Sequence, residues 1–189
     1  MLPWKVISFY TDDDLYNEMI DNLRASLVKF SIPFSIEMIP SHGGWKANTM
    51  AISGHIYDAF DKHEENLVYL DSDAVVRQYP VLFNTIKKDF ACHYNKNGTN
   101  LLAGTMYFKN CAKVKKFVKT WQECSFKRTD KLSAQTGISD ALEKSDISVY
   151  KLPAPYTLIF DSMRKQGPPV IEHFQASRRA RRWGRLYSV

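Results

Sequence analysis

One stretch constrains this chain more than any other: the run from Leu67 to Val76, which reads Leu-Val-Tyr-Leu-Asp-Ser-Asp-Ala-Val-Val. Four apolar residues come directly before Asp71, and such a run is typical of a strand buried on both faces of a sheet. In extended backbone, residues two apart point to the same side, so Asp71 and Asp73 are expected to lie roughly 6–7 Å apart. At that spacing, two like charges repel by about 2–3 kcal/mol at an effective dielectric of about 20.

A divalent cation would offset this repulsion. Carboxylate oxygens are hard ligands, and Mg²⁺ or Mn²⁺ held by one or two carboxylates commonly completes its coordination with phosphate oxygens and water. In open α/β sheets, ligands bind outside the carboxyl ends of the strands, which is where Asp71 and Asp73 fall. The alternative is a polar turn in which one of the two aspartates caps a short helix. These residues alone leave both interpretations open.

The rest of the chain predicts alternating strands and helices. Strands are expected at residues 5–10, 34–39, 67–70, 90–94, 101–108, 147–152, 156–160 and 170–175, where β-branched and aromatic residues gather. Helices are expected from 11–14 to 30, from 48 to 60, and over 114–124 and 133–144, where apolar residues recur at helical spacing. The opening strand, helix and strand favour a parallel sheet. A chain of 189 residues is most simply one domain, covering residues 1–189.

The net charge of +6 is concentrated near the C-terminus. Five arginines lie between positions 178 and 185, and no acidic residue follows Glu172. Removing these five charges from +6 leaves +1, so the rest of the chain is nearly neutral. Such local basicity indicates binding of a specific anion, for example a diphosphate, at least as readily as binding of a nucleic-acid surface.

Three further positions stand out. His173 lies in the last predicted strand, just before the arginines, and a neutral imidazole there could be a third metal ligand or a structural residue. Gly104 interrupts a predicted strand, which indicates either a bulge or close approach of a ligand to the backbone. Trp45 and Lys46 follow a loop with two adjacent glycines and could contact a ligand, although Trp45 could instead anchor the start of a helix.

The chain has no feature that directs it to a membrane. Its N-terminus lacks the basic start and long apolar core of a signal peptide, and no run approaches the roughly 20 apolar residues of a transmembrane helix. Its three cysteines lack metal-binding spacing and are an odd number, which favours reduced thiols. We therefore expect a cytoplasmic protein without a membrane span.

Taken in order, the motifs resemble the small metal-dependent nucleotide-sugar glycosyltransferases of the GT-A fold. The ordered set is Leu-Val-Tyr-Leu-Asp-Ser-Asp-Ala, then Leu-Leu-Ala-Gly-Thr-Met-Tyr-Phe, then Val-Ile-Glu-His-Phe-Gln-Ala-Ser-Arg-Arg, and the resemblance extends over nearly the whole chain. It implies a three-layer α/β/α fold with an open, mostly parallel sheet. It also implies transfer of a hexose from a nucleoside diphosphate sugar, most simply a UDP-sugar, with Mn²⁺ or Mg²⁺.

The resemblance also implies roles for individual residues. Tyr10, Thr11 and Asp12 would line the nucleoside pocket, to which Trp45 and Lys46 are added as candidates. Asp71, Ser72 and Asp73, the Asp-x-Asp motif, would hold the ribose side and the metal, with His173 as the third metal ligand and Asp73 acting in catalysis. Gly104 and Thr105 would lie beside the donor sugar and the acceptor, and Arg178 and Arg179 would contact the diphosphate.

The chain departs from this pattern between residues 133 and 142. Many relatives have an acidic residue near the start of that helix, where it touches the sugar or acts as a general base. Here the sequence is Ser-Ala-Gln-Thr-Gly-Ile-Ser-Asp, and only Gln135 and Asp140 can stand in for it. The sequence therefore leaves open both the base and the choice between inversion and retention at the anomeric carbon.

The acceptor is expected to be a glycan, with nucleic acid as a possible partner because of the local basicity. Two other functions remain as alternatives. A nucleotidyltransferase that makes sugar nucleotides shares the layered sheet, but it usually has a glycine-rich, basic loop after the first strand, where this chain has Tyr-Thr-Asp-Asp-Asp. A non-catalytic nucleic-acid binder could use the arginines, but it gives no reason for Asp71, Asp73 and His173.

Overall fold

The computed structural model describes residues 2–12, 14–43, 45–95, 98, 100–127 and 134–175. The helices are α1 (Asp14–Lys29), α2 (Trp45–Lys62), α3 (Ala112–Phe126) and α4 (Ala134–Glu143), with short 3-10 helices η1 (Val81–Asn84), η2 (Ala154–Thr157) and η3 (Arg164–Gln166). The strands are β1 (Trp4–Thr11), β2 (Phe34–Ile39), β3 (Asn66–Leu70), β4 (Ala74–Val76), β5 (Phe90–Tyr94), β6 (Leu101–Phe108), β7 (Val149–Lys151), β8 (Leu158–Ile159) and β9 (Ile171–His173).

The central sheet has the strand order β2-β1-β3-β6-β5-β7. The pairs β1–β2, β1–β3 and β5–β7 are parallel, whereas β6 is antiparallel to both of its neighbours, β3 and β5. Of these six strands, only β6 is therefore reversed, and the sheet is mostly parallel as predicted. The reversal brings the middle of β6 beside the carboxyl end of β3, since Leu70 is paired with Thr105.

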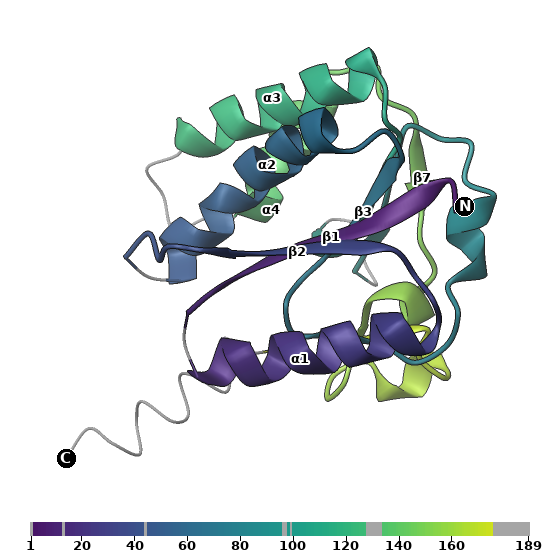
Figure 1. The fold of residues 1–189 in the computed structure, drawn as a ribbon. Helices are drawn as coiled ribbons and strands as arrows, with labels where there is room; N and C mark the ends of the chain where they lie inside the picture. The colour runs from purple at the N-terminus through teal and green to yellow at the C-terminus, as the bar shows by residue number, and fades with distance from the viewer. Residues whose placement is uncertain are drawn as a thin grey trace.

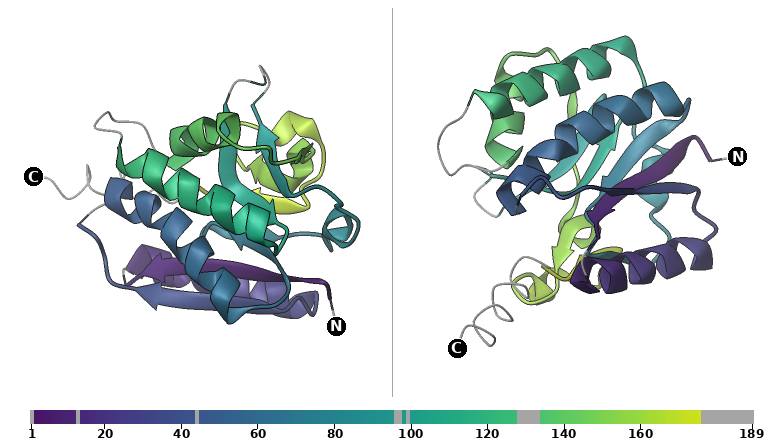
Figure 2. Two further views of the ribbon diagram at one scale, coloured as in Figure 1. Left: turned by 90° about the horizontal axis from the view of Figure 1, so that it is seen from above. Right: turned by 60° about the vertical axis from the view of Figure 1, so that its left-hand side comes forward.

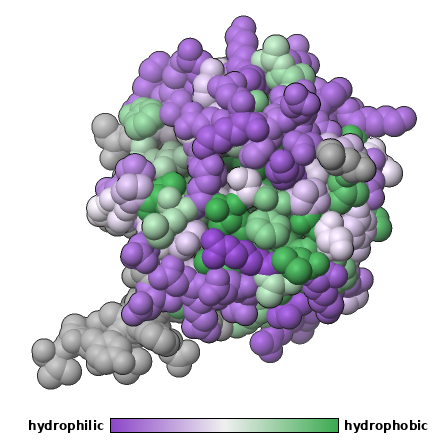
Figure 3. Space-filling model, viewed as in Figure 1, coloured by the Kyte–Doolittle hydropathy of each residue, from purple (hydrophilic) through white to green (hydrophobic). Residues whose placement is uncertain are grey.

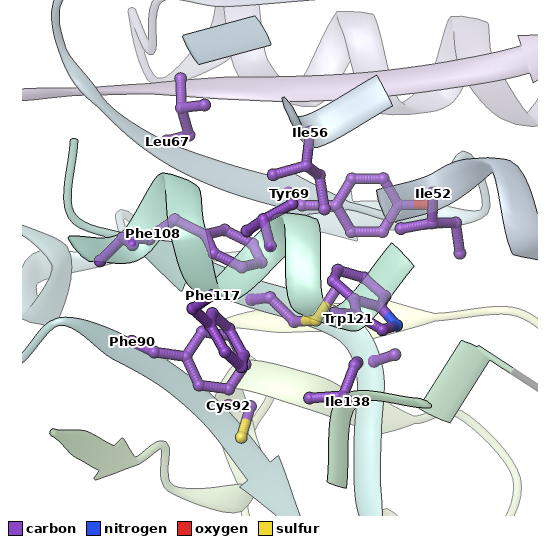
Figure 4. Close-up of a cluster of buried hydrophobic side chains, with 14 of the residues drawn as sticks. Ile52, Ile56, Leu67, Tyr69, Phe90, Cys92, Phe108, Phe117, Trp121 and Ile138 are labelled. Atoms are coloured by element: carbon purple, nitrogen blue, oxygen red, sulfur yellow. The ribbon is translucent and has the colours of Figure 1, made fainter. Parts of the chain in front are cut away.

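Helices cover both faces of this sheet and give three layers. Helices α2, α3 and α4 lie together on one face and α1 lies on the other (Figures 1 and 2). The alternation of side chains along the strands explains the two cores, because neighbouring residues point to opposite faces. Leu67 and Tyr69 of β3 join the core under α2, α3 and α4, part of which Figure 4 shows, whereas Val68 and Leu70 join the core over α1.

A bulge breaks this alternation in β6. Cys92 of β5 is opposite Met106 while His93 is opposite Leu102, so residues 103–105 have no partner in β5. Leu101 and Met106 consequently face the same core although they are an odd number of residues apart. Gly104 lies within this bulge, which is one of the two explanations predicted for it.

A second, smaller sheet has the order β4-β9-β8. Here two predicted strands need correction. Residues 156–160 form mainly the end of η2 and a strand of only two residues, and the strand expected over 170–175 is shorter and belongs to this second sheet. The antiparallel pair β4–β9 is the part that matters for function, because β4 begins directly after Asp73 and β9 ends at His173.

The edge of the central sheet at β2 is partly apolar. Figure 3 shows a band of apolar side chains across the middle of this face, where β2 runs in Figure 1, and Met38 is 60% exposed.

Among the residues that the structure describes, each helix is too short or too polar to cross a membrane.

Candidate metal site

The segment from Asp71 to Ala74 connects β3 to β4 by a tight turn. The backbone N–H of Ala74 donates to the carbonyl of Asp71 at 3.0 Å. The prediction of extended backbone for the Asp-Ser-Asp motif is therefore wrong. The chain turns here because it leaves the central sheet and begins β4, which belongs to the second sheet. The polar turn is thus present, but it leads to strand β4, so neither aspartate caps a short helix there. The turn keeps both carboxylates within one cluster.

His173 reaches this turn through the pairing of β4 with β9. Ala74 is directly opposite His173, and the backbone N–H of Phe174 donates to the carbonyl of Asp73 at 3.2 Å. The imidazole Nδ1 consequently lies 3.3 Å from the Asp73 carboxylate, although the two residues are 100 positions apart in the chain. His173 is almost fully buried, at 2% exposure.

Asp71, Asp73 and His173 form a cluster with the chemistry of a cation site. One ligand atom from each residue lies within 4.8 Å of the others. Ligands of an octahedral Mg²⁺ with bonds of about 2.0–2.1 Å lie about 3–4 Å apart, so small side-chain movements would bring all three into range. Two carboxylates and a neutral imidazole are ligand types that Mg²⁺ and Mn²⁺ accept, and the residues therefore fit such a cation.

The surroundings of Asp71 add to this interpretation. The Tyr69 hydroxyl donates to one carboxylate oxygen of Asp71 at 2.9 Å, and the backbone N–H of Asp71 donates to the Gly104 carbonyl at 2.9 Å. Burial and the neighbouring Asp73 charge raise the pKa of Asp71 to about 6, against the opposite effects of His173 and Tyr69. A positive ion beside the pair would oppose this shift, because it stabilises both charged carboxylates.

Gly104 and Thr105 of β6 lie directly beside the cluster of Asp71, Asp73 and His173. A Cβ atom on Gly104 would lie 2.9 Å from the His173 ring and 3.2 Å from an Asp71 oxygen, so the imidazole fits only because this side chain is absent. Thr105 is fully buried, and its hydroxyl lies 2.9 Å from Nε2 of His173. Its side chain thus faces the imidazole.

The predicted nucleoside residues lie at the carboxyl end of β1, which is parallel and adjacent to β3. Thr11 is buried at the end of the strand, and the Asp12 carboxylate accepts a hydrogen bond from Asn17 at 3.1 Å. Tyr10 is half-buried, with the Arg24 guanidinium 5.4 Å from its ring centre. The structure therefore places these residues at the same edge of the sheet as Asp71.

The structure describes less of the other predicted site residues. Trp45 and Lys46 are the first residues of α2, and Gln135 is the second residue of α4, but their side chains lie outside the described part of the structure. Asp140 is half-buried on α4 and is not a member of the cluster of Asp71, Asp73 and His173. Arg178 and Arg179 lie outside the described residues.

A pocket of about 250 Å³ opens beside Asp73, between α1 and the second sheet. Its lining comprises Glu18, Met19, Asn22, Asp73, Val75, Arg77 and Phe174. The Arg77 guanidinium lies over the Phe174 ring, 5.5 Å from its centre, and is paired with Glu172 at 2.7 Å. On the α1 side, Glu18 and Asn22 give the pocket polar side chains. Asp73 belongs both to this pocket and to the cluster with Asp71 and His173.

Sequence reasoning missed two contacts of the cluster. The Tyr69 contact with Asp71 could have been found from the strand periodicity, since residues two apart share a face. The Thr105 contact with His173 had no signal in the sequence, because it depends on the reversal of β6 and on the bulge at Gly104.

Comparison with known proteins shows similarity in structure and none in sequence. No protein-family profile matches the chain. No curated protein sequence matches it. A glycosyltransferase involved in the glycosylation of the major capsid of PBCV-1 superimposes with a TM-score of 0.74 at 13% identity, covering 98% of this chain and 99% of that one.

Two other solved glycosyltransferases share the fold. The apo form of GlyE from Streptococcus pneumoniae TIGR4 has a TM-score of 0.62 at 16% identity, covering 90% of this chain and 54% of that one. The galactosyltransferase LgtC, solved with donor and acceptor sugar analogues, has a TM-score of 0.54 at 12% identity, covering 98% and 97%. At such identities the likeness establishes the fold. The predicted three-layer GT-A arrangement is therefore confirmed.

Proposed function

We propose that this chain is a metal-dependent glycosyltransferase that moves a sugar, most simply a hexose, from a UDP-sugar to a glycan acceptor. The observation that carries the proposal is the cluster of Asp71, Asp73 and His173 at the carboxyl edge of the central sheet. Ligands of α/β sheets bind at this edge, and the fold is one that solved glycosyltransferases share.

In this proposal, Asp71, Asp73 and His173 hold Mn²⁺ or Mg²⁺. A cation held there would supply positive charge beside the diphosphate leaving group, where negative charge develops. Arg178 and Arg179, which follow His173 in the chain, add charge-assisted hydrogen bonds to the same phosphates. Ser72 and Asp71 face the ribose side of the donor.

The nucleoside binds at the end of β1, next to this cation. Tyr10, Thr11 and Asp12 line that pocket, and Trp45 and Lys46 contact the donor from the start of α2. The support is topological, since β1 and β3 are neighbouring parallel strands and their carboxyl ends meet at one edge. Gly104 and Thr105 are proposed to lie beside the donor sugar and the acceptor, and the space at the Cβ position of Gly104 is taken by the His173 ring and Asp71.

The acceptor is proposed to be a glycan. Gln135 and Asp140, on the helix that packs against α3 and β6, are the candidates to contact the sugar or to act as a base. The described residues contain no observation that favours a nucleic acid, since the five arginines that suggested one lie outside them.

Titration calorimetry with UDP tests the metal site directly. We expect UDP to bind much more tightly with Mn²⁺ than with EDTA, and Asp73→Ala to abolish this gain. The loss should be about 100-fold or more, because removal of a ligand costs at least as much as removal of an outer-shell partner, which is about 10–100-fold. Asp61→Ala is the control, because this aspartate is exposed on α2 and pairs with Lys115.

Equal affinity for UDP with and without Mn²⁺ would contradict the proposal. Incubation with UDP-sugars and Mn²⁺ then separates the alternatives. A glycosyltransferase hydrolyses the donor slowly to UDP and free sugar without an acceptor, whereas a nucleotidyltransferase releases pyrophosphate from a nucleoside triphosphate and a sugar phosphate. A nucleic-acid binder does neither.

A further inference from the structure

We propose that Thr105 is a positioning residue, which holds the orientation of the His173 ring and accepts its Nε2–H, so that Nδ1 is the atom that binds the cation. The inference rests on the proposed metal site and concerns the contact between Thr105 and His173. Three observations carry it: the burial of Thr105, the direction in which each ring nitrogen of His173 points, and the space left by Gly104.

The two nitrogens of the His173 ring face different surroundings. Nδ1 lies 3.3 Å from the Asp73 carboxylate and close to the position of a Cβ on Gly104, which in turn lies 3.2 Å from an Asp71 oxygen. Nε2 lies 2.9 Å from the Thr105 hydroxyl, in the buried interior. The ring therefore turns Nδ1 toward the Asp73 carboxylate and Nε2 toward the Thr105 hydroxyl.

A cation that joins this cluster must bind the lone pair of Nδ1. A neutral imidazole carries one N–H, so the proton must then be on Nε2. Nε2–H needs an acceptor because an unpaired donor in the interior is costly, and the Thr105 hydroxyl supplies it. Without the cation, the same hydroxyl can rotate and donate to Nε2 while Nδ1–H donates to Asp73. Thr105 thus satisfies the ring in both tautomers.

Replacement of Thr105 by valine tests this role, because valine keeps the shape and removes the hydroxyl. Metal-ligating histidines that lose the partner of their second nitrogen typically lose about 10–100-fold in metal affinity. We expect a loss of this size in Thr105→Val, measured as Mn²⁺ binding by electron paramagnetic resonance in the presence of UDP. Thr105→Ser retains the hydroxyl and should recover most of the affinity.

Thr157→Val is the matched control. Thr157 is also buried, at 2% exposure, but its hydroxyl has no hydrogen-bond partner among the described residues. The same substitution there should leave Mn²⁺ affinity unchanged. Comparing the two variants separates loss of the hydroxyl contact with His173 from the general effect of a valine in the core.

A second measurement uses the unmodified protein. Nitrogen-15 NMR of the His173 ring with UDP and Mg²⁺ should show a protonated Nε2 and an unprotonated Nδ1. The opposite tautomer, or equal Mn²⁺ affinity in Thr105→Val and Thr157→Val, would overturn this inference and leave the metal site intact. Absence of Mn²⁺ binding in the unmodified protein would overturn the proposed function and this inference together.

Discussion

Gly104 lies where any side chain would collide with two of the three candidate ligands. A Cβ there would be 2.9 Å from Cε1 and 3.0 Å from Nδ1 of His173, and 3.2 Å from Asp71. The His173 ring is buried and held by Thr105, so it cannot move aside as an exposed side chain could. At the scale of single residues, the cluster thus depends on an absent side chain as much as on the three that are present.

Gly104→Ala should therefore displace the His173 ring and weaken the metal site. We expect Mn²⁺ affinity to fall at least as far as in Thr105→Val, and the free energy of unfolding to fall by about 1–3 kcal/mol through overpacking. Both are measured on the same samples, by electron paramagnetic resonance and by urea denaturation. Gly54→Ala is the control, because a Cβ there meets only the end of the Gln122 side chain at 3.3 Å. Unchanged Mn²⁺ affinity in Gly104→Ala would contradict the steric argument.

Among the secondary-structure elements, β5 and β7 at one edge of the central sheet are connected through the side chain of Asp89. It lies just before β5, and its carboxylate accepts hydrogen bonds from the backbone N–H of Ser148 at 3.0 Å and from the Ser148 hydroxyl at 2.8 Å, just before β7. Lys113 on α3 pairs with the same oxygen at 3.3 Å. These contacts, with the backbone bond of Ser148 first, lower the pKa of Asp89 below its usual 3.8.

Because the folded protein depresses this pKa, the stabilisation is complete above pH 3.8 and is lost as the pH falls through the folded value. Asp89→Asn should lower the free energy of unfolding by about 1.5–3 kcal/mol near neutral pH, the usual contribution of hydrogen bonds to a charged group. The difference between the two proteins should shrink below pH 3.8, as followed by urea denaturation across a pH series. Asp146→Asn, at an exposed carboxylate that pairs with the same Lys113, should have little effect. A difference that does not change with pH would contradict the assignment.

At the scale of the whole molecule, folding and donor binding are expected to depend on different parts of the chain. Among the described residues, which end at Gln175, two hydrophobic cores lie on the two faces of the central sheet. The proposed phosphate contacts, Arg178 and Arg179, come after Gln175. A chain that ends at Gln175 should therefore keep its hydrophobic cores and lose most of its affinity for the donor.

Deletion of residues 176–189 should leave the melting temperature of the free protein unchanged and remove most of its stabilisation by UDP and Mn²⁺. Two charge-assisted contacts to phosphate contribute roughly 3–6 kcal/mol together. In the full chain, Arg178→Gln with Arg179→Gln should reproduce this loss, and Arg181→Gln with Arg182→Gln is the matched control. Failure of the truncated chain to fold would show that the deleted segment is structural.

Local sequence patterns were enough to predict most of the elements and the candidate residues of the site. The periodicities of two and 3.6 are local properties, so β2, β5 and β6 begin and end where the pattern predicted, and the helices differ from it by a few residues. The buried run before Asp71 identified the central strand, and the order of Asp71, Asp73 and His173 identified the candidate ligands. These inferences needed no knowledge of which strands are neighbours.

The way in which these parts meet follows from tertiary contacts. The reversal of β6, the second sheet and the turn at Asp71 depend on hydrogen bonds between distant segments, and a periodicity carries no information about the partner or direction of a strand. His173 meets Asp73 across 100 residues, and Thr105 meets His173 across 68, because β4 pairs with β9 and β6 lies beside β3. Local patterns therefore identified the candidate ligands, and the pairing of strands brings them to face one another.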